Sequence, residues 1–182
     1  MRLFVAIEID PAICERIHEL VSSLRTKISG ARWVRPEGMH ITLKFLGNVA
    51  DERRSGIENA LRCVAKKTFT VSLKQLGVFP NPRLPRVLWV GIEAGPELEQ
   101  LATAVDQQMN SLGFEREKRA FSPHVTLARF NQRPGGNLGS ILASAQPGFG
   151  TMTAKEFHLY ESKLSPQGSR YIELASFKLE QA

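Results

Sequence analysis

A short motif that occurs twice constrains this chain more than any other feature. Residues 40–43 read His-Ile-Thr-Leu, and residues 124–127 read His-Val-Thr-Leu. Each copy follows a turn, and a helix candidate and a short basic extended segment come before each turn. Since the two halves of the 182 residues echo each other, the sequence predicts a single domain, residues 1–182, made of two similar lobes.

Alternating helix and strand signals indicate the fold class. We expect strands at residues 3–9, 39–46, 69–78, 87–92, 124–130, 153–164 and 171–179, and helices at about 11–29, 51–66, 96–112 and 138–145. Extended pieces at 31–34 and 118–121, a rigid proline loop at 79–85, a break at 133–136 and a turn at 165–168 connect them. The expected architecture is α+β, with two pseudo-symmetric lobes of mostly antiparallel sheet and outer helices around a central cleft.

Composition and charge narrow the class of protein. Hydrophobic residues make up 42% and charged residues 23%, as in ordinary soluble globular proteins. The net charge of +6 favours phosphate-bearing partners, although many small domains are mildly basic without such a partner. The first apolar run, interrupted by Glu8, is too short to span a membrane and lacks a cleavage site, so we expect a cytoplasmic protein without membrane contact. Cys14 and Cys63 are expected to be reduced and at least half-buried.

Strand geometry predicts how each motif presents its side chains. Successive side chains of a strand point to opposite faces, so His40 and Thr42 share one face. His124 and Thr126 share a face in the second copy. Residues 41, 43 and 45 (Ile, Leu, Phe) would then form the apolar back of the first strand.

This arrangement suits phosphodiester chemistry. One group must take a proton from the nucleophile and another must give one to the leaving oxygen, and histidine does both near neutral pH. The hydroxyls of Thr42 and Thr126 can donate to phosphate oxygens where charge develops. A single His-x-Thr is more often structural, but its repetition favours a functional pair, His40 and His124. Neither copy has an acidic residue or cysteine at metal-ligand spacing, so no metal and no cofactor are expected.

Other side chains are weaker candidates. Lys44 would share the His40 face in a regular strand and could bind phosphate, or it could be a solvated lysine. Arg129 would need a bulge or strand twist to reach the His124 face. Three aromatic side chains could stack on a nucleobase, although packing in the core is favoured for each of them: Phe4, Phe79 and Trp89. Four basic side chains that precede the two motif turns could form a positively charged rim of the site, or they could be ordinary solvated surface residues: Arg32, Arg35, Lys118 and Arg119.

Residues 40–47 (HITLKFLG) and 122–129 (SPHVTLAR) resemble the two signature motifs of the 2H phosphoesterase superfamily, and specifically the RNA 2′,3′-cyclic phosphodiesterase (2′-5′ RNA ligase-like) family. The resemblance extends over nearly the whole chain. It implies hydrolysis of a terminal 2′,3′-cyclic phosphate to a 2′-phosphate without a metal, with reverse 2′-5′ ligation as a side activity. It also implies that His40 is the proton donor and His124 the proton acceptor, and it places Arg129 in the family pattern.

Two alternatives stay open from the sequence. One is a related two-histidine enzyme that acts on small cyclic nucleotides or ADP-ribose cyclic phosphate. The other is an RNA-end binding module without catalysis, which the retention of both histidines and both threonines disfavours. The expected partner is an RNA with a 2′,3′-cyclic phosphate end, such as a tRNA fragment, or a cyclic nucleotide, and a monomer is expected.

Overall fold

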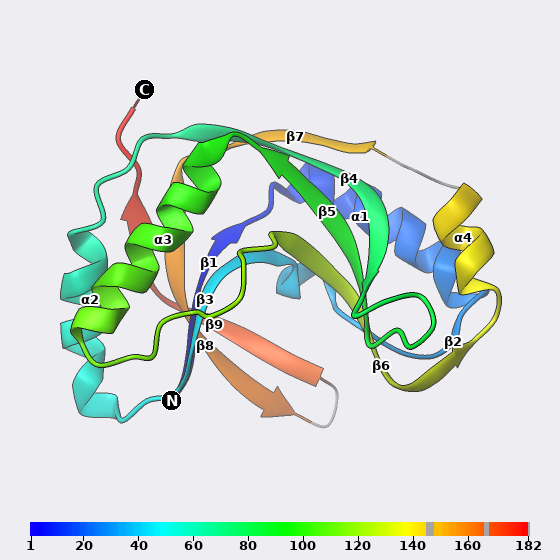
Figure 1. Cartoon of the computed structure of the whole chain (residues 1–182), viewed down its shortest axis with the longest axis horizontal. Helices are drawn as coiled ribbons and strands as arrows, with labels where there is room; N and C mark the ends of the chain where they lie inside the picture. Colours follow the sequence, from blue (N-terminus) through cyan, green and yellow to red (C-terminus); the bar gives the residue numbers. More distant parts are fainter. Residues whose placement is uncertain (145–147, 166–167, 182) are drawn as a thin grey trace.

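Two antiparallel sheets form the frame of the molecule (Figure 1). The structure, a computed structural model, describes residues 1–144, 148–165 and 168–181. The strands are β1 (Arg2–Glu8), β2 (Ser29–Trp33), β3 (His40–Asn48), β4 (Phe69–Phe79), β5 (Val87–Ala94), β6 (His124–Gly135), β7 (Gly148–Ala154), β8 (Glu156–Ser165) and β9 (Gly168–Lys178). Their order is β3-β1-β8-β9 in one sheet and β2-β6-β5-β4-β7 in the other. The expected α+β class with antiparallel sheets is confirmed.

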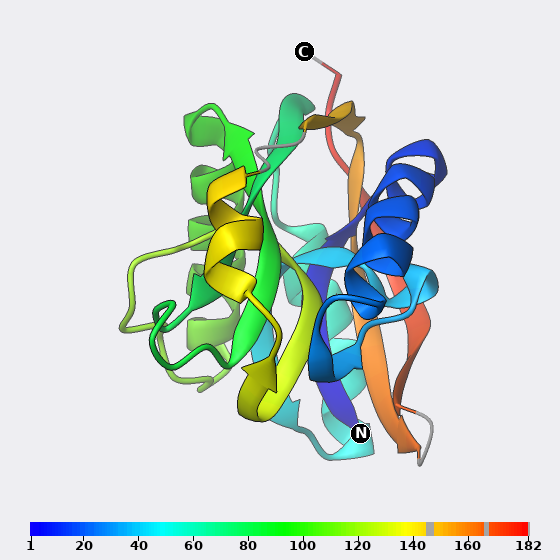
Figure 2. The same ribbon diagram turned by 90° about the vertical axis from the view of Figure 1, so that its right-hand side faces the viewer.

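The helices lie outside the sheets, at the two ends of the molecule. They are α1 (Pro11–Arg25), α2 (Arg54–Arg62), α3 (Pro96–Ser111) and α4 (Leu138–Ser144), and single 3-10 turns occur at η1 (Pro36–Gly38) and η2 (Asp51–Arg53). Figure 1 shows α2 and α3 together at one end and α1 and α4 at the other, and Figure 2 shows α1 and α3 on opposite sides of the strands.

The two halves repeat the same order of elements. In the first half β1 leads into α1, and the chain returns as β3 to pair with β1. In the second half β5 leads into α3, and the chain returns as β6 to pair with β5. The duplication seen in the motifs therefore extends to the strand and helix that precede each motif.

Helix α1 shows why these segments fold as they do. Pro11 occupies its first turn, where a missing N–H costs nothing, and its buried residues recur every three or four positions. They are Ile13, Ile17, Val21 and Leu24. They join one continuous apolar cluster that includes residues of both sheets. Fully burying such a side chain contributes about 1.5–3 kcal/mol, so this shared core holds the two sheets in fixed relation.

The strand expected at residues 153–164 is in fact two strands, and that prediction is wrong. β7 ends at Ala154 and pairs with β4, whereas β8 begins at Glu156 and pairs with β1 and β9. The chain crosses from one sheet to the other at Lys155. No glycine or proline marks this crossing, so local patterns do not reveal it.

Smaller expectations at element ends are also corrected. β6 continues to Gly135 through the expected break, because its pairing with β5 ends at Arg129 and Pro134 has no ladder bond to lose there. α2 ends at Arg62 rather than near residue 66, and α1 ends at Arg25 rather than at residue 29, where β2 begins. Residue 145 of the expected fourth helix, and 166–167 of the expected turn, lie outside the described residues.

Both cysteines are free, as expected. Cys14 is half-buried, but Cys63 is exposed, contrary to expectation, because it follows the end of α2. Within the described part of the chain, no helix is both long and apolar enough to cross a membrane.

Candidate active site

The fold brings together two histidines that are far apart in the sequence. His40 begins β3, opposite Glu8 of β1, and His124 begins β6, opposite Gly91 of β5. β3 and β6 belong to different sheets but contact each other. A proton on His124 would lower the pKa of His40, which indicates that the two rings are neighbours.

The same backbone contact anchors both imidazole rings. Nδ1 of His40 lies 2.8 Å from the carbonyl oxygen of Gly38, and Nδ1 of His124 lies 2.8 Å from that of Ser122. A carbonyl oxygen only accepts, so Nδ1 must donate and carry the proton of each neutral ring. Nε2 is then left as the atom that can take a proton from water or, once protonated, give one to a leaving group.

The threonine hydroxyls lie beside the rings. Thr42 pairs with Ala6 and Thr126 pairs with Trp89, two positions along the strand from each histidine. Both threonines are half-buried, and neither hydroxyl is hydrogen-bonded to another residue that the structure describes. Both therefore have a free donor for the oxygens of a bound phosphate.

Each motif strand carries a β-bulge at its leucine. The pairing of β3 with β1 skips Leu43, and the pairing of β6 with β5 skips Leu127. A bulge inserts one extra residue, so the alternation of faces shifts by one beyond it. The histidine and threonine of each motif keep their predicted shared face, but the residues after each leucine exchange faces.

Lys44 lies on the side of β3 away from His40, so the prediction that they share a face is wrong. The bulge at Leu43 turns Lys44 to the back of the sheet, where it is only 7% exposed. Its Nζ donates to Asp106 Oδ1 at 2.5 Å and to the carbonyl oxygen of Glu115 at 2.9 Å. Its charge is thus used within the fold, in an ion pair with α3, and is neither solvated nor directed to the histidines.

Arg129 lies on the same face of β6 as His124, which it would not do in a regular strand. The bulge at Leu127 sends Ala128 to the core and turns Arg129, which is exposed, towards the side of His124. Its charge lowers the pKa of both His124 and His40. A guanidinium that acts on both rings is well placed to neutralise a phosphate between them.

Both histidines are neutral in the free protein at pH 7. The pKa of His40 is lowered to about 4, mainly by burial and then by the charges of Arg129 and His124, against the bond to Gly38. The pKa of His124 is also lowered, mainly by burial and then by Arg129, against the bond to Ser122. A bound anion acts in the opposite direction, because negative charge nearby stabilises the protonated ring.

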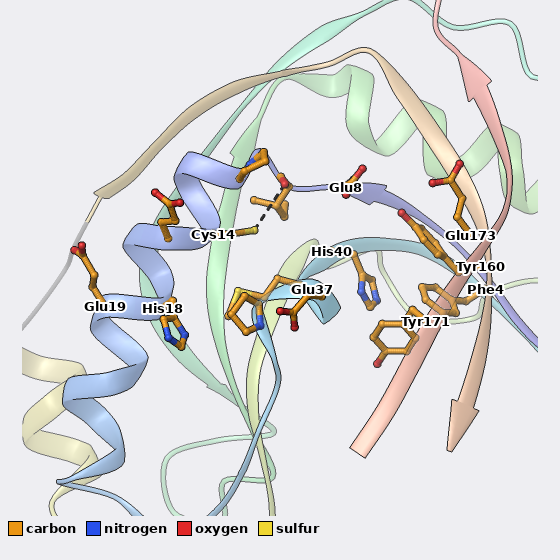
Figure 3. A pocket seen from close by; sticks show the side chains of 15 residues that line it. Phe4, Glu8, Cys14, His18, Glu19, Glu37, His40, Tyr160, Tyr171 and Glu173 are labelled. Atoms are coloured by element: carbon orange, nitrogen blue, oxygen red, sulfur yellow. Dashed lines mark hydrogen bonds between the residues drawn. The ribbon is translucent and has the colours of Figure 1, made fainter. Parts of the chain in front are cut away.

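Aromatic rings pack around each histidine. Figure 3 shows Phe4 and Tyr171 beside His40, with ring centroids 4.7 Å and 5.1 Å from its ring. Phe79 lies 5.0 Å and Trp89 6.5 Å from the ring of His124. Phe4 is only 2% exposed and the other rings are partly buried, which agrees with the packing role favoured for Phe4, Phe79 and Trp89. These contacts hold each imidazole in place and supply the apolar surroundings that lower its pKa.

An acidic cavity of about 670 Å³ opens beside His40, between α1 and η1 (Figure 3). Its aromatic lining includes Phe4, Tyr160 and Tyr171. Five carboxylates also line it: Glu8, Glu15, Glu19, Glu37 and Glu173. Such a charge repels phosphate groups, so it directs them away from this side of His40 and towards Arg129.

The expected basic rim is formed only in part. Arg32 of β2 pairs directly with Arg129 of β6, so two exposed guanidinium groups stand on neighbouring strands. Arg35 is exposed just before η1. Lys118, in contrast, is paired with Glu115. The anchoring carbonyls of Gly38 and Ser122 were not predicted, although both lie two residues before a motif histidine.

The remaining histidines stand outside this site. His18 is exposed on α1, where it lines the acidic cavity rather than either motif strand, and His158 is 3% exposed within β8. Over the described ranges, no cluster of three or more His, Cys, Asp or Glu side chains is arranged to hold a metal ion. What the site offers is two neutral imidazoles, two hydroxyl donors and one guanidinium, a set suited to proton transfer at a phosphate.

Comparison with known proteins agrees with this geometry. The family described as LigT-like phosphoesterase matches residues 7–89 and, separately, 90–171, one match for each half of the chain. A protein of Archaeoglobus fulgidus named RNA 2′,3′-cyclic phosphodiesterase is 37% identical over 98% of this chain and 100% of its own length. One of the same name from Methanothermobacter thermautotrophicus is 31% identical over 98% and 99%. The crystal structure of E. coli LigT complexed with 3′-AMP superposes with a TM-score of 0.80 at 29% identity, covering 98% of this chain and 97% of that one.

The matches cover both motif strands, both bulges and nearly all of the core. Family, fold and the arrangement of the two His-x-Thr strands therefore lead to one conclusion: the chain is an enzyme of the LigT-like phosphoesterase family, within the 2H phosphoesterase superfamily.

Proposed function

We propose that this enzyme hydrolyses the 2′,3′-cyclic phosphate at the end of an RNA to a 2′-phosphate. The observation that carries the proposal is the pair of like-built strands, each with a free Nε2 and a free threonine hydroxyl. The names of the relatives from Archaeoglobus and Methanothermobacter support the same reaction. The net charge of +6 and the exposed Arg32 and Arg129 suit an RNA partner.

The proposed reaction is a single in-line displacement. Nε2 of His124 takes a proton from water as its oxygen attacks phosphorus, and the bond from phosphorus to O3′ breaks. Nε2 of His40 gives its proton to O3′, so the products are a 2′-phosphate and a 3′-hydroxyl. Thr42, Thr126 and Arg129 stabilise the charge that builds on the non-bridging oxygens. With the 5′-hydroxyl of a second RNA in place of water, the same step forms a 2′-5′ linkage.

Protonation of His40 depends on the substrate. The pKa of His40 is lowered to about 4 in the free protein, so at neutral pH it lacks the proton that a general acid needs. The cyclic phosphate carries a negative charge, and its arrival raises the pKa of the adjacent ring. Binding of the substrate thereby favours the protonated form of His40, which acts as the general acid.

The roles of the two histidines follow from the family resemblance, since the two rings are anchored alike. A substrate with sulfur in place of O3′ distinguishes them, because a thiolate leaves without protonation. We expect His40→Ala to regain most of its lost rate on the sulfur substrate and His124→Ala to regain none. The reverse pattern would exchange the two roles.

The proposed function is tested on an oligonucleotide that ends in a 2′,3′-cyclic phosphate. His40→Ala and His124→Ala should each lower kcat by about 10²–10⁴-fold, the usual contribution of a general acid or base. His18→Ala, which removes an exposed histidine of α1, is the matched control and should leave kcat unchanged. Near-full activity in the double variant would refute the proposal.

Three further measurements complete the test of the proposed function. Phosphorus NMR of the product should show the phosphate on the 2′ oxygen. A chelator should leave the rate intact, because we propose a metal-independent enzyme, active as a monomer on RNA ends in the cytoplasm. A cyclic mononucleotide should be turned over more slowly than the oligonucleotide, whereas the opposite order would favour a nucleotide-metabolising enzyme.

A further inference from the structure

An exposed aromatic ring lies on the catalytic side of β3. The described part of the chain exposes four large hydrophobic side chains: Phe45, Leu84, Leu164 and Ile172. Phe45 is the aromatic one, at 64% exposure, and it is the residue that follows Lys44 on the first motif strand. Single exposed apolar side chains are common on protein surfaces, so what distinguishes Phe45 is its place on the first motif strand, next to the site, rather than its exposure alone.

The bulge at Leu43 is what exposes the ring. In a regular strand Phe45 would face the core with Ile41, and Lys44 would face the histidines. The bulge exchanges them: Lys44 is buried against Asp106, and Phe45 points to solvent on the face of His40. The strand thus buries its charged residue and exposes its apolar one, the reverse of what core packing favours.

Phe45 is connected to the reactive centre by direct ring contacts. The ring of Phe4 lies 6.0 Å from that of Phe45 and 4.7 Å from that of His40. Phe4 itself is 2% exposed and offers no open face to a ligand. Phe45 therefore presents the accessible ring face nearest to His40 and Thr42 on this strand.

The second motif shows what its equivalent position does. The bulge at Leu127 turns Arg129 towards the site, just as the bulge at Leu43 turns out Phe45. One position of the pair carries a cation suited to phosphate, and the other carries a flat apolar ring. A substrate that satisfies both has a phosphate and an adjacent aromatic group.

From this we infer that Phe45 binds the RNA by stacking on one of its nucleobases. The inference rests on the proposed function and names how the substrate is held there. Stacking uses the face of any base, so it adds affinity with little sequence preference. The acidic cavity on the other side of His40 repels the phosphates of the RNA, which leaves the Phe45 side for the base of the nucleotide that carries the reacting phosphate.

The test compares ring removal with ring retention, on a trinucleotide that ends in a 2′,3′-cyclic phosphate. Phe45→Leu keeps an apolar side chain without the ring and should raise KM by about 5- to 150-fold with kcat nearly unchanged, the loss of one stacked base. Phe45→Trp should keep or lower KM. Leu164→Ala is the control, because it removes another exposed apolar side chain, 73% exposed on β8. It should leave KM unchanged.

A binding measurement separates stacking from folding. With 2-aminopurine in the 2′-phosphate product trinucleotide, the fluorescence quenching seen with wild type should persist with Phe45→Trp and be lost with Phe45→Leu. Inorganic phosphate should inhibit all variants equally. Equal KM for Phe45→Leu and wild type, or a loss of kcat alone, would overturn the inference while leaving the proposed function intact. A wild-type enzyme that does not turn over the trinucleotide would instead refute the proposed function.

Discussion

Replacing Lys44 with methionine should destabilise the enzyme without weakening its hold on RNA. Lys44 is 7% exposed and Asp106 has a side chain 14% exposed, so removing the lysine leaves a carboxylate largely out of water. Breaking such a pair costs about 3–5 kcal/mol. Asp106 keeps two donors, Arg116 Nε and the Glu117 amide, each at 3.1 Å, so we expect the lower end, about 3 kcal/mol. For a chain of this length that corresponds to roughly 6–12 °C in Tm.

The effect should depend on pH in a defined direction. Burial acts to raise the pKa of Asp106, but hydrogen bonds from Lys44, Glu117 and Arg116 and the charge of Lys44 lower it overall from its usual 3.8. A carboxyl whose folded pKa is depressed adds stability above its unfolded pKa and loses it as pH falls through the folded value. The difference between wild type and Lys44→Met should thus be full at pH 7 and shrink below about pH 4.

Urea denaturation at pH 7 and pH 3, with kcat and KM for the cyclic-phosphate oligonucleotide, checks both claims. Lys163→Met removes an exposed lysine, paired at 3.6 Å with Glu161, and should cost less than about 1 kcal/mol. Unchanged stability for Lys44→Met would refute the reasoning on the buried pair. A raised KM with a shallower salt dependence would show instead that Lys44 reaches the RNA.

Three further outcomes are expected. Gly77→Ala should lower kcat/KM at least tenfold and lower the free energy of unfolding in urea by about 1–3 kcal/mol. The reason is that a Cβ at this position would lie 2.2 Å from the ring of Trp89, which packs against His124. The control Gly56→Ala, in open space on α2, should leave the stability unchanged or raise it. Thr126→Val should lower kcat by about 10²–10³-fold and Thr126→Ser by far less, since serine keeps the donor; equal losses would exclude the hydroxyl as the cause. In the free protein the His40 ring should titrate near pH 4 by NMR, and inorganic phosphate should move that midpoint upwards; a midpoint that falls would contradict an anion site beside the ring.

The sequence predicts much of this fold because its signals are local. The helical spacing of apolar residues in α1 and the alternation in the first motif strand depend on neighbours within a turn or two, so the start of α1 and both ends of β3 were predicted to within two residues. The end of α1 was expected at residue 29 but lies at Arg25. The shared face of His40 and Thr42 follows from the same alternation. The crossing at Lys155 depends instead on which distant strand each segment pairs with, and no local residue marks it.

The part of the site that was missed lies beyond the bulges. Alternation placed Lys44 with the histidines and Phe45 in the core, and one inserted residue at Leu43 reverses both. A signal was present, since Arg129 needs a bulge to reach its histidine and the duplication predicts the same bulge in the first copy. The carbonyl anchors of the rings depend on turn geometry, which the pattern of side chains does not encode.

The paired bulges also affect the direction in which an RNA strand can bind across the site. Two identical half-sites would accept a cyclic phosphate in either of two orientations related by the approximate twofold axis, and each histidine would then serve as acid in one of them. The two halves differ two residues past each bulge, where one half carries the ring of Phe45 and the other the guanidinium of Arg129. An RNA runs from 5′ to 3′ and has no twofold symmetry, so only one orientation satisfies both. The difference between Phe45 and Arg129 thereby selects one 5′-to-3′ direction of the RNA at a reaction centre that is otherwise nearly symmetrical.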